Sequence, residues 1–192
     1  MRKIVLLLLC LMAFSSSAFA SGWQDDIKAI AETQKAGVLY EVYHGMPWDD
    51  FESAWQDVPG WRRINDEVDH HGFHHVLLEK QGKDADGVTQ EFAIVSDDMG
   101  TGNVGLATLR FTAPDEKTAD RIYAFILEQF RSNLGGNNAK LPSRDPFTQK
   151  THTTLVWIKG DKAYEVNHKP NAPTMVEISC HRNEKYYHRD IY

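Results

Sequence analysis

The chain contains few cysteines. Of its 192 residues only Cys10 and Cys180 are cysteine, and Cys10 lies in an apolar N-terminal run that we interpret as a removed segment. Cys180 alone then remains, which excludes an intramolecular disulfide and any zinc site built on cysteine pairs. Cys180 shares a predicted strand face with Val176 and Ile178, so we expect a buried, apolar side chain rather than a catalytic thiol.

The sequence also lacks runs of basic residues. It has 21 Lys and Arg against 27 Asp and Glu, a formal charge of −6. Without its first 20 residues the chain has 19 basic and 27 acidic residues, a charge of −8. Nucleic acids and anionic membranes attract basic patches, so we expect neither as a partner.

No apolar stretch is long enough for a membrane-spanning helix. The longest, Ile4–Phe14, is shorter than the roughly 20 residues that cross a bilayer. It follows Arg2 and Lys3 and precedes the small-residue site Ala18-Phe19-Ala20. This order of charged start, apolar middle and A-x-A site is typical of a secretory signal peptide. We predict cleavage after Ala20, a single domain over residues 21–192, no later transmembrane segment, and a secreted or periplasmic location of the bacterial envelope type.

Three segments carry helical periodicity. Residues 23–31 predict a short amphipathic helix that ends near Gly37. A second helix is expected from Pro47 to Pro59-Gly60, and the clearest follows Thr112–Asp115 and ends at Gly135-Gly136. Strands are predicted over 38–43, 73–80, 89–96, 104–111, 153–159, 163–168 and 174–180.

The order of these elements predicts an α+β fold, an antiparallel sheet with two main helices packed on one face. Each half runs strand, helix, antiparallel strands, which we interpret as a tandem βαβββ duplication with half-repeats 37–98 and 103–181. The layout is similar to that of β-lactamase-inhibitor-like and other small two-repeat envelope proteins. The resemblance is topological, covers most of residues 21–192, and carries no functional residue across.

The most unusual patch is the histidine-rich segment 69–75. It contains His70, His71, His74 and His75, and imidazole is a common ligand of zinc and copper. In a strand, however, His74 and His75 point to opposite faces, so further ligands would have to come from elsewhere in the fold. The alternative interpretation is a polar loop that leads into a half-exposed strand.

Two other motifs resemble the sequences of known sites but lack the structural context that those sites require. Residues 100–105 read G-x-G-x-x-G, but a strand rather than a helix is predicted to follow, which favours a hairpin turn. Asp84-Ala-Asp86-Gly87 lacks the ligand spacing and flanking helices of a calcium loop, so we expect a turn there as well.

Aromatic residues offer candidate contacts for a partner. Trp48 and Trp55 have core spacing, whereas Trp61 follows Pro59-Gly60 and is a candidate anchor, as are Tyr186 and Tyr187 near the C-terminus. With no catalytic motif and no expected cofactor, we predict an exported binding module, for protein partners, rather than an enzyme. The alternative is a zinc- or copper-binding protein, or a metal-dependent enzyme, that uses the histidine patch.

Overall fold

The computed structural model describes residues 22–33, 37–97, 102–144 and 151–182. The helices are α2 (Trp23–Glu32), α3 (Trp48–Trp55) and α4 (Glu116–Leu134). The strands are β1 (Val38–Leu39), β2 (Val42–Tyr43), β3 (Trp61–Val68), β4 (His74–Lys80), β5 (Thr89–Ser96), β6 (Val104–Thr112), β7 (Ala139–Arg144), β8 (Thr151–Lys159), β9 (Lys162–His168) and β10 (Met175–Arg182).

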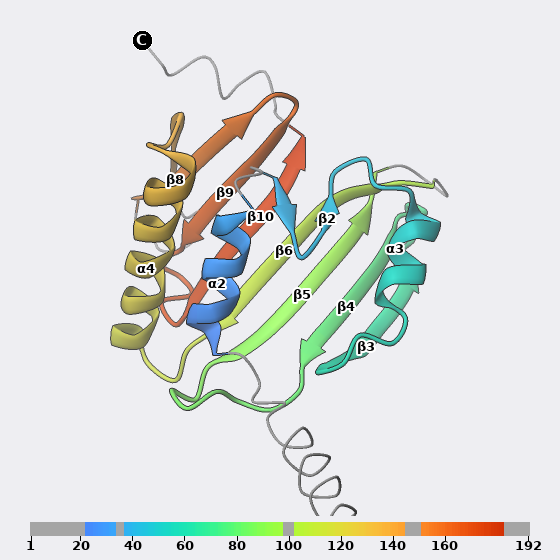
Figure 1. Ribbon diagram of the computed structural model, residues 1–192, viewed down its shortest axis with the longest axis horizontal. Coiled ribbons are helices and arrows are strands. Elements are labelled where there is room, and N and C mark those ends of the chain that lie inside the picture. Colours follow the sequence, from blue (N-terminus) through green and yellow to red (C-terminus); the bar gives the residue numbers. More distant parts are fainter. Residues whose placement is uncertain (1–21, 34–36, 98–101, 145–150, 183–192) are drawn as a thin grey trace, which may run out of the picture.

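Eight of the strands form one antiparallel sheet, in the order β3-β4-β5-β6-β10-β9-β8-β7 (Figure 1). Strands β3 to β6 form one meander and β7 to β10 another, and the two meanders meet where β6 pairs with β10. The predicted α+β class with an antiparallel sheet is confirmed. Strands β1 and β2 form a separate small hairpin.

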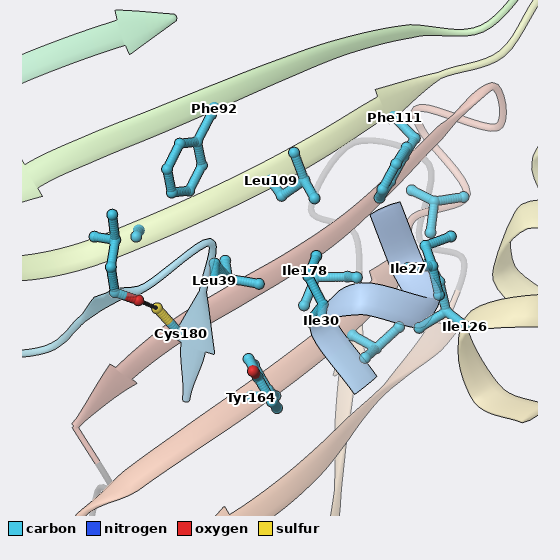
Figure 2. Packing of buried hydrophobic residues seen from close by; sticks show 14 of the residues in the cluster. Ile27, Ile30, Leu39, Phe92, Leu109, Phe111, Ile126, Tyr164, Ile178 and Cys180 are labelled. Atoms are coloured by element: carbon cyan, nitrogen blue, oxygen red, sulfur yellow. Dashed lines mark hydrogen bonds between the residues drawn. The ribbon is translucent and has the colours of Figure 1, made fainter. Parts of the chain in front are cut away.

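All three helices pack on the same face of the sheet (Figure 1). Their apolar residues join inward-facing strand residues in one core, where Ile27, Ile30 and Ile126 lie over Leu109 and Ile178 (Figure 2). Because side chains alternate along a strand, the intervening strand residues point to the other face. We call this side, which carries none of the described helices and includes Leu77, Ala93, Leu106 and Thr108, the open face.

Helix α4 has the strongest local signals. The Asp115 carboxylate caps it by accepting a hydrogen bond from Thr118 N at 2.7 Å, which satisfies one of the free amides of the first turn. Ala119, Ile122, Ile126 and Phe130 form its buried stripe. The helix ends at Gly135, whose φ of 87° favours glycine. It was therefore predictable at both ends.

Residues 38–43, predicted as one strand, instead form the β1–β2 hairpin, which lies over β6 (Figure 1). The two-residue turn is Tyr40-Glu41, with φ values of 47° and 72°. Turns of this kind normally take Asn-Gly, so the sequence carries no turn signal. The cost is offset by packing, because the Tyr40 ring lies within 6.0 Å of the rings of Trp55, Trp61 and Phe92.

Two strands were not predicted, β3 and β7, and both lie at the edges of the sheet. Strand β3 is largely exposed and rich in charge, and β7 contains Pro142. With these strands included, a helix followed by four antiparallel strands occurs twice along the chain. An origin by duplication stays a prediction.

Candidate interaction surface

The two histidines of β4 lie on opposite faces of the sheet, as the alternation predicts. His74 is on the helix-covered face, where its ring stacks on Trp48 of α3 at 4.7 Å between centroids. Its Nε2 lies 2.6 Å from Asp66 Oδ1 on β3. His74 therefore connects helix α3 to the edge strand.

His75 is on the open face and contacts the turn between β3 and β4. Its Nε2 lies 3.0 Å from Asp69 Oδ2, while Asp69 Oδ1 accepts hydrogen bonds from the amides of His71 at 2.8 Å and Phe73 at 3.0 Å. Partial desolvation raises the pKa of Asp69, but these three hydrogen bonds outweigh it and bring the pKa down to about 2. Asp69 thus organises the turn as a carboxylate.

His70 and His71 are exposed, with ring centroids 3.7 Å apart. The residues that the structure describes include no group of three or more His, Cys, Asp or Glu side chains arranged to hold a metal ion. A zinc or copper site at His70, His71, His74 and His75 stays a prediction that the geometry does not favour.

Of the aromatic candidates, Trp61 is half-buried and packs against the core, with ring centroids 5.8 Å from Tyr40 and from Trp55. Its role in binding a partner is untested. Tyr186 and Tyr187 lie outside the described residues. Trp48 and Trp55 are buried, as predicted from their spacing.

The remaining motifs have structural roles. Cys180 is fully buried, as predicted, and burial raises the pKa of its thiol to about 12. Asp84 accepts hydrogen bonds from the amides of Asp86 and Val88, which closes the predicted turn. Gly105 begins no helix; a Cβ there would lie 2.5 Å from the Cα of Asp97, so glycine is required by close packing.

The open face carries an apolar patch formed by Leu77, Ala93, Val95 and Leu106. The sequence alone did not indicate this patch. Ala93 pairs with Leu77, and Val95 pairs with Leu106, across neighbouring strands. Leu106 is 37% exposed and is one of three large hydrophobic side chains that are exposed among the described residues. Such an apolar centre on an uncovered sheet face is typical of a contact surface.

A row of charged side chains crosses the open face beside this apolar patch. Arg110 lies at its centre, with Nη1 2.9 Å from Glu91 and Nε 3.0 Å from Glu177. Partial burial lowers the pKa of Arg110, but these hydrogen bonds raise it overall. Arg62 pairs with Glu79 at 2.6 Å, and Lys169 with Glu177 at 3.1 Å. Glu79 faces Glu91 directly across β4 and β5, and each of these carboxylates is bonded to an arginine of its other neighbouring strand.

With Glu67 and Asp69, which lie beyond His75, the border of the apolar patch has five carboxylates and three cations. The surface therefore combines an apolar centre with an acidic rim. The alternation of residues 73–80 predicts that Leu77 and Val76 point to opposite faces of the sheet. The neighbours of Leu77 on adjacent strands depend on the register of the sheet, which the alternation does not predict.

Neither edge of the sheet favours strand addition. Strand β3 has a bulge between Arg63 and Asn65 and is exposed and charged, and β7 carries Pro142, which has no amide to donate. These features are known to block edge-to-edge pairing. The open face is therefore the better surface for a partner.

Comparison with known proteins does not indicate a function for this surface. No protein-family profile, curated protein or solved structure that was compared with the chain matches it. Among the helices of the described residues, none has both the length and the apolar character needed to cross a bilayer.

Proposed function

We propose that this is an exported protein that binds another protein through the open face of its sheet. The observation that carries the proposal is the apolar patch of Leu77, Ala93, Val95 and Leu106, which none of the described helices covers. Protein interfaces combine an apolar centre with a polar rim, as this surface does. The signal-peptide pattern of residues 1–20 supports export.

The acidic rim defines the kind of partner. Five carboxylates against three cations around the patch favour a protein surface with an apolar centre and lysine or arginine at its border. Glu79 and Glu91 lie side by side on this rim, each also bonded to an arginine, so an incoming basic side chain reaches two carboxylates at one point. Nucleic acid and anionic membrane do not fit this charge.

Site-specific photo-crosslinking tests the proposal. A photoreactive phenylalanine derivative replaces Leu106 on the open face, or Ala124, an exposed residue on α4, as the matched control. Each protein is expressed in the source cells with its own first 20 residues, and envelope and culture fluid are irradiated. We expect one protein adduct of defined mass from position 106 and none from position 124, with lysine or arginine in the cross-linked peptide.

Substitution then separates surface contact from chance proximity. Leu106→Glu adds a charge to the apolar patch and should abolish adduct formation from a probe at Ala93, whereas Ala124→Glu should leave it unchanged. If no adduct forms from position 106, or if Ala124 yields the same adduct, the open face is not the binding surface.

A further inference from the structure

The open face carries a second apolar cluster, over β7, β8 and β9. It consists of Ala139, Val156 and Ala163, with Leu141 and Ile158 packed beside them. We propose that the C-terminal segment, residues 183–192, lies over this cluster and covers it. The proposal does not rest on the binding of a partner protein, because the apolar patch on β4, β5 and β6 is a different region of the face.

Contacts with helix α4 establish the face on which this cluster lies. Trp157 of β8 and Tyr164 of β9 contact Phe130 of α4, with ring centroids 5.3 and 5.1 Å from it. Because side chains alternate along a strand, the preceding residues, Val156 and Ala163, point to the open face. The cluster therefore lies on the opposite side of the sheet from α4.

The cluster is buried although none of the described helices packs on this side of the sheet. Val156 and Ala163 are 0% exposed, and the members of the cluster come only from three strands. On the other half of the same face, Leu106 is 37% exposed, and Leu77 and Ala93 are half-buried. A sheet face is excluded from water only where a second layer packs on it. The full burial of Val156 therefore indicates a covering segment.

The C-terminal segment begins next to the cluster. Arg182, the last residue of β10, pairs with Lys162, which precedes Ala163 on β9. Ten residues of the sequence follow Arg182, enough for about 30 Å of extended chain. The distance from β10 to β7 is three strand spacings, about 14 Å. The segment is therefore long enough to cross the whole cluster.

The sequence of the segment suits an apolar cluster. Tyr186, Tyr187, Ile191 and Tyr192 are four of its ten residues. A tyrosine ring buries a large apolar area and can keep its hydroxyl at the edge, near water. Tyr186 and Tyr187, which sequence analysis offered as anchors for a partner, thus have a binding surface within their own chain.

The connection between β7 and β8, residues 145–150, is the alternative cover, and it is too short. It joins Arg144 to Thr151, which pair at the far end of β8. Val156 lies five residues beyond Thr151, about 17 Å along the strand. A connection of six residues that returns to the neighbouring strand reaches at most half its extended length, roughly 10 Å.

Thiol accessibility in residues 21–192, and in the same protein ended after Arg182, tests the proposal. Ala163→Cys places a thiol in the cluster, and Ala93→Cys places one in the apolar patch as the matched control. The Ala163→Cys thiol should react with a thiol reagent at least about tenfold faster once residues 183–192 are removed, since only an accessible thiolate reacts quickly. The Ala93→Cys thiol should react at the same rate in both proteins.

Cys180, which is fully buried against the helix-covered face, reports whether the shortened protein stays folded. Mass spectrometry should find it unmodified in both proteins. If Cys180 reacts in the shortened protein, the full-length variant Tyr186→Ser/Tyr187→Ser decides: the Ala163→Cys thiol should react faster in it while Cys180 stays protected. An Ala163→Cys thiol that reacts no faster in a folded protein that lacks the segment or its two tyrosines would overturn the proposal.

Discussion

The hydroxyl of Tyr164 on β9 binds both backbone groups of Val38 on β1. It accepts a hydrogen bond from Val38 N at 3.0 Å and donates one to the Val38 carbonyl. Burial raises the pKa of the Tyr164 phenol well above its ordinary value, so the proton needed for donation is retained across the physiological range. One side chain from the second half of the chain thus anchors the β1–β2 hairpin.

Tyr164→Phe should therefore destabilise the protein by about 1–3 kcal/mol, because it leaves a partly buried amide and carbonyl without their partner. Denaturant unfolding of residues 21–192 measures the change. Tyr123→Phe is the matched control, since Tyr123 is half-buried against His168 and its hydroxyl has no hydrogen-bond partner among the described residues. An equal effect of the two variants would contradict the anchoring role.

A glycine in the turn of the same hairpin should increase the stability of the folded protein. Glu41 is exposed with φ of 72°, a left-handed conformation that costs a non-glycine residue about 1–2 kcal/mol. Glu41→Gly should stabilise the protein by about 0.5–1 kcal/mol after the entropy of glycine in the unfolded chain is counted. Glu128→Gly, exposed within helix α4, should instead destabilise it by about 1 kcal/mol. Thermal unfolding of both variants shows whether each substitution raises or lowers the stability.

The elements that sequence analysis predicted share a clear physical signal. Helix α4 has a cap, an apolar stripe and a terminal glycine, and β5 alternates buried with half-buried residues. The elements that were missed lack such signals. Strand β3 is exposed and charged because it is an edge, and β7 contains a proline that only an edge tolerates.

The candidate surface was less predictable than the fold for a related reason. That His74 and His75 point apart follows from alternation alone. That Leu106 lies beside Val95 depends on the register with which β5 pairs with β6, and no local pattern specifies which face the helices cover. Residues of a surface patch thus come together through tertiary pairing rather than through a motif.

Cys180 should be inert in the native protein. Its pKa is raised to about 12 by burial, and its Sγ lies against the Val42 carbonyl at 3.8 Å. Since only the thiolate reacts quickly, a thiol reagent at pH 8 should modify Cys180 only after denaturant is added. Mass spectrometry of native and denatured samples checks this. Rapid native modification would show that the β1–β2 hairpin opens readily.

The β3–β4 turn predicts an acid-dependent loss of stability. The folded pKa of Asp69 is about 2, below its ordinary value of 3.8, so its contribution is present above about pH 4 and is lost as the pH falls toward 2. The free-energy difference between wild type and Asp69→Asn should therefore shrink over that interval. Gln56→Ala, an exchange of uncharged residues at an exposed site, should give a difference that does not change with pH. A constant difference for Asp69→Asn would show that the carboxylate is not stabilising the turn.

The most consequential pair in the core is Asp26 on α2 and Lys80 on β4. Their atoms lie 2.5 Å apart, and Gln90 Nε2 donates to the same Asp26 oxygen at 2.7 Å. Lys80→Met should cost about 3–5 kcal/mol, because it leaves the Asp26 carboxylate buried without its cation. Adding Asp26→Asn removes that charge but keeps an acceptor for Gln90, so the double variant should recover most of the loss.

The recovery separates an uncompensated charge from simple loss of packing, since both variants carry the same methionine side chain in place of the lysine. The exposed pair of Arg62 and Glu79 is the comparison: its arginine is 64% exposed, and Arg62→Met should cost less than about 1 kcal/mol. Denaturant unfolding of the single and double variants provides the coupling energy between Asp26 and Lys80. A double variant no more stable than Lys80→Met alone would mean that the lysine stem, rather than its charge, holds helix α2 against the sheet.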